Sequence, residues 1–543
     1  MARGDVKIIT KGDEARSKLL QGAKEVYDAV SATYGAVSGN VGIQKSYGGA
    51  VVTHDGVTVA REVYLRDEVE DMGAGLLVQA SEKTNQIAGD GTSATVLLGY
   101  HILNKANKSV AAGYNPMAIR RGIDKASLWI KDQLDNKAKP VEDKDLSKVA
   151  TISASDPAVG QLVADTIVKV GGVGITVEEY QGLGVIQDIV DGVYFEKGWT
   201  MPHFVTDRTT EEAVHENVNV IVLEKAIKQN QDIVPLIELI NKTTESKTVL
   251  FIGNISGQAL ETCALTNIYP KSTVKICVVS PPVYGDQVLP FLEDLAVLTG
   301  GKVIPNSLPS SKVTDEYIGE ADKIIVGKGT TTILGCRGIQ EDIDLRIDTI
   351  KEQLQSDKFT PFQKERMEMR LSKLQGKIGI IRVGGATETE AKEMKFRVED
   401  AIHATRAARE DGVVPGGATT LARLSLEADD TTLPALSQDE VQGFKIVLES
   451  LVEPFKQLME NSGEDGGYRL QQVLKSKVGY GFDVTTMTDE PINLKDVLDP
   501  VKVIRSVVEN ACSFAGVAIT IPLTITYDRK YQLEQVQLNK AGM

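Results

Sequence analysis

The 543-residue sequence contains few cysteines and histidines, the residues from which metal cages and disulfide frameworks are built. Its four cysteines are widely spaced and form no CxxC pair, so neither a zinc cage nor a disulfide framework is indicated. We expect reduced, partly buried thiols instead. The five histidines include no HExxH pair, which leaves a zincin-type site without support. Any catalysis is therefore expected to rest on carboxylates.

A long apolar run and a positive net charge are also missing. No stretch approaches the ~18 apolar residues of a membrane span, and the N-terminus lacks the apolar core of a signal peptide. Because 75 acidic residues outnumber 60 basic ones, the formal net charge of -15 disfavours nucleic acid and anionic membrane surfaces as partners. We therefore expect a cytoplasmic protein that binds neither.

The sequence does contain enough aliphatic residues for large cores. Hydrophobic residues make up 42% of the chain and aromatic residues only 5%, and the length suggests roughly three to four domains. Apolar spacing predicts amphipathic helices over residues 14–35 and 68–89. Between them, β-rich runs at 51–53 and 57–59 predict a hairpin around an Asp-Gly turn. From about 175 to 340, β-branched runs alternate with helical stretches, which predicts a separate α/β domain.

The segment that follows, residues 348–377, is highly charged, with helical apolar spacing and a break at Pro361, so we expect a solvated helical hairpin.

Two glycine-rich stretches resemble phosphate-binding loops but do not match such a motif. In IIVGKGTTT, at 324–332, Asp322 stands where a P-loop needs its first glycine, so we expect a strand end and a turn. VVPGGATTLARL, at 413–424, places paired glycines before a helix, an arrangement that is common without a ligand.

The stretch IAGDGTSATV, at 87–96, is a stronger candidate for a phosphate site. If the apolar run after it is a helix, the unpaired N-terminal amides and the hydroxyls of Thr92 and Ser93 suit phosphate oxygens. Asp90 is then free to hold a hard cation such as magnesium, which favours one or two carboxylates together with phosphates and water. The same residue types are ordinary helix caps. Taken alone, the stretch leaves a site and a cap equally favoured.

Several motifs in order along the chain resemble the bacterial-type (group I, GroEL-like) chaperonins, nearly end to end. They are TYGAVSGNV at 33–41, THDGVTVARE at 53–62, GDGTS at 89–93, GYNPMAIRRGIDKA at 113–126, RVEDAIHATRAA at 397–408, and then GVVPGGA and LDPVKV. The resemblance implies a multidomain α+β chaperonin fold. A mostly helical equatorial ATP-binding domain would comprise 1–136 and 412–543, an intermediate domain 137–191 and 377–411, and an α/β apical domain 192–376. Pro140 and Gly412 would mark one hinge, and Gly192 and Gly376 the other.

The function implied by this resemblance is that of an ATP-dependent molecular chaperone. It would enclose and refold non-native proteins inside a homo-oligomer of two stacked seven-membered rings, with a GroES-like co-chaperonin as a lid. The implied cofactors are ATP, Mg²⁺ and K⁺. Phosphoryl transfer agrees with the residues present, because it needs in-line water and charge neutralisation and not a Cys or His nucleophile.

Individual site residues follow from the same resemblance. Asp90 matches the magnesium-binding aspartate, Asp55 the carboxylate near the γ-phosphate, and Asp400 the intermediate-domain aspartate that positions the attacking water, so that hydrolysis waits for closure. Asp499 would accept the ribose. The other nucleotide-binding positions would be Thr33, Tyr34, Gly35, Ala36, His54, Gly56, Gly91, Thr92, Ser93, Gly417, Asp483, Val484 and Thr485.

The implied client and co-chaperonin surface lies on two predicted helices, at 233–240 and 257–268. The matching positions are Val234, Ile237, Leu260, Ala264 and Leu265, with Trp199, His203 and Phe204 in a neighbouring segment. Periodicity alone would place these helices in a core, because an apolar stripe at helical spacing usually faces inward. His203 and Ala264 make this surface less apolar than the common pattern, which bears on client range.

The sequence also departs from the family pattern near the nucleotide. Ala36 stands where Pro is usual, His54 where Lys is usual and Asp483 where Asn is usual, and the GDGTS run is one residue shorter. The tail VQLNKAGM, at 536–543, lacks Gly-Gly-Met repeats. Two alternatives to a chaperonin ATPase therefore stay open: an ATPase-impaired holdase on the same fold, motivated by the altered loop, and a stand-alone magnesium-dependent phosphotransferase, motivated by the carboxylates alone.

Overall fold

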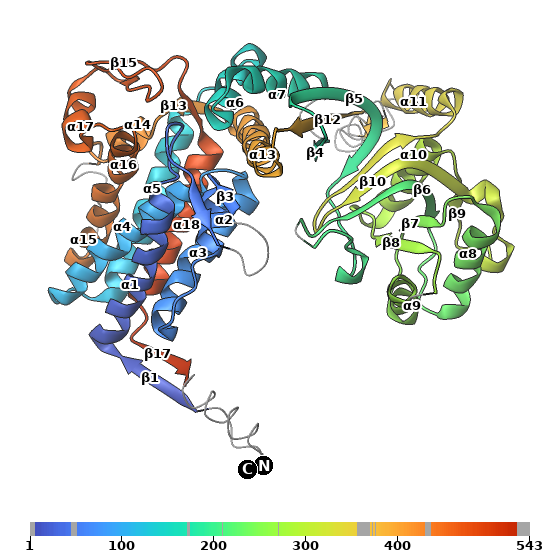
Figure 1. The fold of residues 1–543 in the computed structure, drawn as a ribbon, viewed down its shortest axis with the longest axis horizontal. Coiled ribbons are helices and arrows are strands. Elements are labelled where there is room, and N and C mark those ends of the chain that lie inside the picture. Colours follow the sequence, from blue (N-terminus) through green and yellow to red (C-terminus); the bar gives the residue numbers. More distant parts are fainter. Residues whose placement is uncertain are drawn as a thin grey trace. The chain divides into compact units, whose positions relative to one another are not determined.

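The computed structural model describes residues 6–44, 51–170, 174–208, 210–269, 271–355, 367, 370–371, 373–374, 376–428 and 436–528 (Figure 1). The chain forms two compact units. The first, called the helical unit below, comprises Met1–Asp165, Val177–Ile186 and Val383–Met543, and the second, the α/β unit, comprises Thr166–Thr176 and Gln187–Arg382. Pro361 and the tail at 536–543 lie outside the described residues.

The chain passes from one unit to the other within four elements, namely α7 (Pro157–Val170), β4 (Ile175–Glu179), β5 (Gly184–Phe195) and β12 (Lys377–Gly384). All four crossings fall inside the predicted intermediate segments, 137–191 and 377–411. The further division of the helical unit into equatorial and intermediate domains stays a prediction. A multidomain α+β organisation is confirmed, because one unit is mostly helical and the other is built on a sheet.

The helical unit is held together by a core of aliphatic side chains, as the composition predicts. Its long helices contain the two expected amphipathic segments, and α3 begins at Asp67, whose carboxylate accepts the amides of Val69 and Glu70. The helices are α1 (Gly12–Ser31), α2 (Gly56–Arg61), α3 (Glu68–Ala88), α4 (Thr92–Ala111), α5 (Pro116–Lys137), α6 (Leu146–Ala154), α13 (Glu388–Asp411), α14 (Thr419–Leu424), α15 (Gln438–Ser450), α16 (Glu453–Asn461), α17 (Gly466–Lys475) and α18 (Val501–Ile519), with the short 3-10 turn η1 (Asp143–Asp145).

Short strand pairs join these helices. β1 (Lys7–Lys11) pairs with β17 (Leu523–Tyr527), β2 (Val41–Ile43) with β3 (Val51–Thr53), β13 (Val413–Pro415) with β16 (Leu498–Pro500), and β14 (Tyr480–Gly481) with β15 (Ile492–Asn493), all antiparallel.

The predicted hairpin over 51–59 is wrong in its second half. Residues 51–53 do form a strand, but its partner is β2, and residues 57–59 belong to α2. The reason is a local cap. The Asp55 carboxylate accepts hydrogen bonds from the amides of Val57 and Thr58, which starts a helix despite the β-branched residues that follow. Burial of Val57 and Val59 then stabilises that helix.

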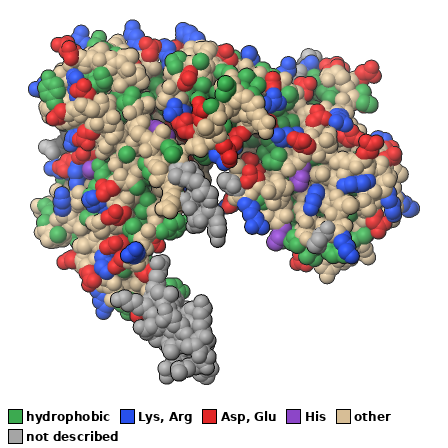
Figure 2. Space-filling view, in the orientation of Figure 1, with side chains coloured by type: hydrophobic (Ala, Val, Ile, Leu, Met, Phe, Trp, Pro, Cys, Tyr) green, Lys and Arg blue, Asp and Glu red, His purple; other side chains and the backbone are tan. Residues whose placement is uncertain are grey.

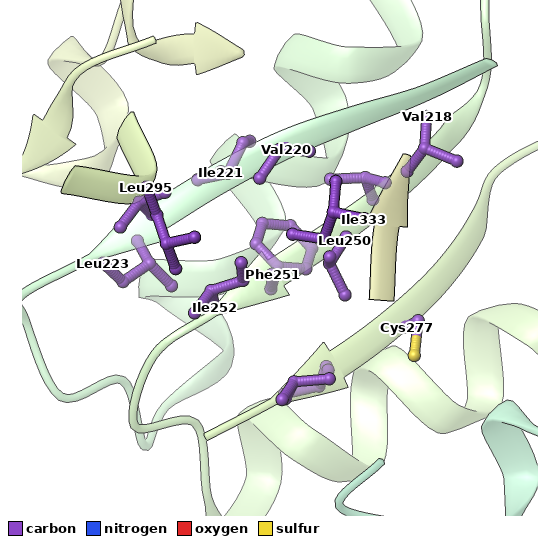
Figure 3. Close-up of a cluster of buried hydrophobic side chains, with 14 of the residues drawn as sticks. Val218, Val220, Ile221, Leu223, Leu250, Phe251, Ile252, Cys277, Leu295 and Ile333 are labelled. Atoms are coloured by element: carbon purple, nitrogen blue, oxygen red, sulfur yellow. The ribbon is translucent and has the colours of Figure 1, made fainter. Parts of the chain in front are cut away.

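A nine-stranded mixed sheet forms the centre of the α/β unit, in the order β4-β12-β5-β11-β10-β6-β7-β8, with β9 beside β6. β6, β7 and β8 are parallel, so their apolar residues are buried on both faces, and Figure 3 shows Ile221, Phe251 and Cys277 among them. The remaining elements are η2 (Pro202–Phe204), β6 (Ala213–Leu223), α8 (Asn230–Thr243), β7 (Thr248–Ile252), α9 (Gly257–Ile268), β8 (Lys275–Val279), η3 (Gly285–Gln287), α10 (Val288–Thr299), β9 (Val303–Ile304), η4 (Ser310–Lys312), η5 (Asp315–Tyr317), β10 (Ile318–Val326), β11 (Thr331–Cys336) and α11 (Gln340–Gln355).

Several smaller expectations are also confirmed. The stretch at 324–332 is the end of β10 and the turn into β11. α11 ends at Gln355, inside the segment 348–377 that is predicted to form a charged hairpin, and because the break and most of the second arm lie outside the described residues, the hairpin stays a prediction. The four thiols are free, and burial raises the pKa of each to about 12.

On the face drawn in Figure 2, Lys and Arg side chains alternate with Asp and Glu side chains over both units. The described residues on this face form no large patch of a single charge sign.

The predicted hinge residues lie in pairs. Lys139, next to Pro140, exchanges two backbone hydrogen bonds with Val413, next to Gly412. Gly412 has a φ of 79° and ends α13. Gly192, on β5, lies against Ile378, two residues after Gly376. The structure therefore brings together the partners of each predicted hinge, and hinge motion itself stays a prediction.

Candidate functional site

The turn Gly89-Asp90-Gly91 connects α3 to α4 in the helical unit. Gly89 ends α3 with a φ of 69°, and Gly91 begins α4 with a φ of 85°. Because the residue at the cap position is a glycine, no side chain among the described residues caps the first turn of α4. The Asp90 carboxylate instead accepts the amide of Gly91 and, at 3.4 Å, the hydroxyl of Ser153 on α6. The interpretation of Asp90 as an ordinary helix cap is therefore not supported, and the amides of α4 keep their partial positive charge.

Two other loops meet this turn. The Thr33 hydroxyl lies 3.2 Å from the Ser93 hydroxyl. Gly56, at the start of α2, packs so closely that a Cβ there would lie 2.1 Å from Ser93 Oγ and 3.2 Å from Thr92 Oγ1. The hydroxyls of Thr33, Thr92 and Ser93 thus gather in one place, beside Asp55, which precedes Gly56.

Asp55 and His54 are both fixed by local hydrogen bonds. Besides the two amides that it caps, Asp55 accepts the Thr58 hydroxyl at 2.5 Å. Ser38 Oγ donates to the carbonyl of Gly35 at 2.6 Å and lies 2.8 Å from His54 Nε2, so the imidazole donates to the serine oxygen. Burial lowers the pKa of His54, and the charge of Arg397 lowers it further. A neutral histidine therefore ties the Gly35 loop to the Asp55 loop.

Carboxylates from separate segments influence one another at this place. Burial raises the pKa of Asp400 well above its usual range, and the charges of Asp90 and Asp55 raise it further. Burial also raises the pKa of Asp90, with a contribution from Asp55. The pKa of Asp499 is raised to about 6, mainly by burial and also by the charge of Asp90. Asp55 at the N-cap of α2, Asp90 in the α3–α4 turn, Asp400 on α13 and Asp499 on β16 thus lie close enough for their charges to interact.

This acid cluster, defined as Asp55, Asp90, Asp400 and Asp499, is not a preformed metal cage. Among the described residues, no three His, Cys, Asp or Glu side chains are arranged to hold a metal ion. Magnesium bound by one carboxylate together with phosphates and water needs no such cage. The donor set therefore fits a magnesium–phosphate ligand better than a bare structural metal.

The far end of the site is built around Asp499. Gly417 and Ala418 have positive φ angles of 62° and 55°, and their amides point at the Asp499 carboxylate, with Ala418 N at 3.4 Å from Oδ2. Asp483 accepts the amide and the hydroxyl of Thr485 at 2.9 and 2.6 Å. Phe482, which precedes Asp483, presents its carbonyl to Gly417.

An apolar wall adjoins these polar groups. Tyr34 and Val484 pack against a buried cluster that includes Leu458 and Phe482. Gly35, with a φ of 102°, lies directly on Leu458, because a Cβ there would be 2.3 Å from Leu458 Cδ1. Burial raises the pKa of Tyr34, and the charges of Asp499 and Asp90 add to it, so Tyr34 lies near both ends of the site. The next residue, Ala36, is half-buried in the same turn.

The structure thus brings the predicted nucleotide-site residues together within one unit. Sequence reasoning missed Ser153, Ser38 and Leu458, which contact Asp90, His54 and Gly35. Their hydroxyl and aliphatic side chains carry no motif, and Leu458 lies on α16, far along the chain from Gly35. No signal in the sequence could have assigned them.

The predicted client surface is realised only in part. Val234 on α8 and Leu265 on α9 are 39% and 63% exposed, and His203 is exposed. Trp199, Ile237 and Leu260 are partly buried against the core of the α/β unit.

Phe204 and Ala264 correct the prediction, because they are 1% and 5% exposed and belong to that core. η2 packs against α9 and β8, which covers Phe204, and Ala264 is on the inner face of α9. Ile268 and Tyr269 are exposed at the end of α9 and were missed, although their spacing from Leu265, three and four residues, places all three on one helix face.

The chain is similar to known proteins both in sequence and in fold. The model of the TCP-1/cpn60 chaperonin family matches residues 26–527. Among solved structures, the chaperonin gp146 from the bacteriophage EL of Pseudomonas aeruginosa aligns with a TM-score of 0.69 and 20% identity, over 96% of this chain and 99% of that one. At that identity the likeness concerns the fold. Searching the described helices for one long and apolar enough to cross a bilayer finds none.

Proposed function

The chain belongs to the TCP-1/cpn60 chaperonin family, and from this premise we propose that it is an ATP-hydrolysing chaperone that encloses non-native proteins in a ring of identical subunits. The observation that carries the ATPase part is the acid cluster beside the uncapped start of α4, in which the charge of Asp90 raises the pKa of Asp400 and of Asp499 and the charge of Asp55 raises the pKa of Asp90 and of Asp400. Such a site is electrostatically incomplete without a cation, and its helix amides suit an anion. A magnesium–nucleotide complex supplies both charges. The phage chaperonin was crystallised in the presence of ATP-BeFx, which is in keeping with this proposal.

Each residue of the site would have its own role in binding the magnesium–nucleotide complex. Asp90 would hold Mg²⁺, which neutralises phosphate charge, while the hydroxyls of Thr33, Thr92 and Ser93 and the α4 amides would bind phosphate oxygens. Asp55, fixed as the cap of α2, would face the terminal phosphate.

Asp400 would orient the attacking water. Its raised pKa makes it a better acceptor for that water's proton than an ordinary aspartate would be. Asp499 would accept a ribose hydroxyl, with Gly417, Asp483 and Thr485 around the nucleoside and Tyr34 and Val484 as its apolar wall. K⁺ is proposed as an activating ion from the family resemblance.

Client binding is proposed for the exposed apolar residues of α8 and α9. Val234, Leu265, Ile268 and Tyr269 leave apolar surface that an unfolded chain or an apolar loop of a GroES-like lid could cover. Two stacked seven-membered rings and a location in the cytoplasm complete the proposal.

One experiment tests the proposed function. ATP turnover is measured with and without Mg²⁺ and K⁺, together with the recovery of an aggregating client enzyme in the presence of a GroES-type co-chaperonin. Turnover that depends on both ions and raises client recovery is the expected result. Client binding without turnover would instead indicate a holdase. A protein that sediments as a monomer and phosphorylates a small molecule would indicate a phosphotransferase.

A further inference from the structure

A chain of buried polar side chains runs through the aliphatic core of the helical unit and ends at the Gly89–Gly91 turn. Its members are Asn510 on α18, Thr84 on α3 and Thr95 on α4, which are 4%, 0% and 0% exposed. Asn510 Nδ2 lies 2.9 Å from Thr84 Oγ1, Thr84 Oγ1 lies 2.9 Å from Thr95 Oγ1, and Thr95 Oγ1 lies 3.0 Å from the carbonyl oxygen of Gly91. The three helices pack directly against one another (Figure 1).

The hydrogen bonds of this chain can all point the same way. If Asn510 donates to Thr84, Thr84 to Thr95 and Thr95 to the Gly91 carbonyl, each hydroxyl donates once and accepts once. Thr84 has another acceptor in the Ala80 carbonyl, but at a longer distance of 3.2 Å. Since an unsatisfied polar group in a core is costly, these hydrogen bonds favour one geometry of the three side chains. The Gly91 carbonyl, which also accepts the backbone amide of Thr95 at 3.0 Å, is thereby linked through side chains to α3 and α18.

Direct packing fixes the same turn onto the same helix. A Cβ on Gly91 would lie 2.8 Å from Val503 Cγ1 and 2.8 Å from Val507 Cγ2, so the glycine is seated on α18. Val503, Val507 and Asn510 are spaced by four and three residues, which puts them on one face of α18. A further buried hydroxyl, that of Ser81 on α3, donates to the carbonyl of Thr92 at 3.2 Å.

α18 begins at Val501, directly after the strand that carries Asp499. The turn seated on α18 carries Asp90. Because Gly91 is seated on α18 and α18 follows β16 directly, a tie between the turn and α18 sets the position of Asp90 relative to Asp499.

We propose that Asn510, Thr84 and Thr95 are positioning residues that fix the Asp90 turn relative to Asp499, and thereby set the geometry in which Mg²⁺ and the phosphates are bound. None of the three touches the reacting atoms. The inference rests on the proposed ATPase function for its consequence, but not for the positioning itself.

The test uses the full-length protein and four variants. Thr95→Val removes the hydroxyl that holds the Gly91 carbonyl, and Thr95→Ser restores it. The double variant Thr84→Val/Asn510→Leu replaces both partners of the Asn510–Thr84 contact by apolar groups, a change that is close to neutral for stability. It also removes the contact between Thr84 and Thr95, and it leaves the hydrogen bond from the Thr95 hydroxyl to the Gly91 carbonyl in place. Ser450→Ala is the matched control, since Ser450 is equally buried and donates only to a carbonyl of its own helix, Ile446 O.

The first readout needs no catalysis. Hydrogen exchange measured by mass spectrometry should be about tenfold faster in the peptide covering residues 87–98 of Thr95→Val and of the double variant, because about one buried hydrogen bond is lost. Peptides from α5 should be unchanged. Thr95→Ser and Ser450→Ala should match the wild type. Unchanged exchange in residues 87–98 of both variants would overturn the proposal, whether or not the protein hydrolyses ATP.

The second readout separates positioning from a general loss of structure. The Mg²⁺ concentration for half-maximal ATP turnover should rise about tenfold in Thr95→Val and in the double variant, while turnover at saturating Mg²⁺ falls less. A uniform fall in turnover with unchanged Mg²⁺ dependence would mean that these residues serve stability only. If the wild type shows no turnover, the proposed function fails, and the exchange measurement still decides the positioning.

Discussion

Replacing Asp499 with asparagine should stabilise the protein when no nucleotide is bound. Burial and the charge of Asp90 raise the pKa of Asp499 from 3.8 to about 6. An acid whose pKa is higher in the folded state than in the unfolded chain favours folding less and less as pH rises between those two values, because the unfolded chain gives up the proton first. The change from 3.8 to about 6 corresponds to about 3 kcal/mol lost from the unfolding free energy above pH 6. Asparagine keeps an oxygen for the amides of Gly417 and Ala418 but carries no charge.

The assay is thermal melting of nucleotide-free protein at a series of pH values from 8 down toward 4. Asp499→Asn should melt above the wild type at pH 8, and the difference should shrink as pH falls through 6 toward 4. Asp489→Asn, an exposed acid of the same unit, should melt like the wild type throughout. In an Asp90→Asn background the gain from Asp499→Asn should be smaller, because one source of the repulsion is gone. A melting temperature of Asp499→Asn equal to or below that of the wild type at pH 8 would refute the reasoning.

Two further predictions concern turnover and clients. Asp400→Ala should keep ATP binding but lose turnover by about a hundredfold or more, since it removes the group that orients water. Wild-type-like hydrolysis in this variant, measured by phosphate release, would show that Asp400 does not orient the water. Leu265→Ser changes a side chain that is 63% exposed, so it should weaken binding of an unfolded client in a pull-down without changing the melting temperature. Ala264→Ser, at a buried position on the same helix, should lower the melting temperature instead.

How far the sequence could predict this site depends on whether the signal is local. The Gly-Asp-Gly turn and the α4 helix were predictable, because two glycines and the apolar run after them act within a few residues. Whether Asp90 caps that helix could not be predicted, since caps and sites use the same residue types. The cap at Asp55 was local too, but it was outweighed in prediction by the β-branched residues of VTV, which is why the hairpin was expected there.

Contacts between distant segments could not be predicted from spacing at all. Ser153 reaches Asp90 across 63 residues, and Asn510 reaches Thr84 across 426. Asn510 is on the buried face of α18, and nothing in its neighbourhood along the sequence indicates that its partner is a threonine near the other end of the chain. The same limit explains Phe204 and Ala264, because an apolar residue near a surface helix is compatible with either face until the packing of η2 and α9 is known.

Repulsion among the four acids also predicts how ligand binding should act on α13. Asp400 is on α13, and the charges of Asp90 and Asp55, which belong to other segments, raise its pKa, so their mutual repulsion favours withdrawal of α13 when no cation is bound. A ligand that brings positive charge between them removes this repulsion, and α13 should then be held more firmly. Hydrogen exchange in residues 397–408 should therefore slow with ATP and Mg²⁺ together, and slow less with ATP in the presence of EDTA. In Asp400→Asn, which carries no charge to repel, exchange in this segment should already be slow without ligand. Equal exchange of the two proteins in the absence of ligand would mean that packing, and not repulsion among the acids, sets the position of α13.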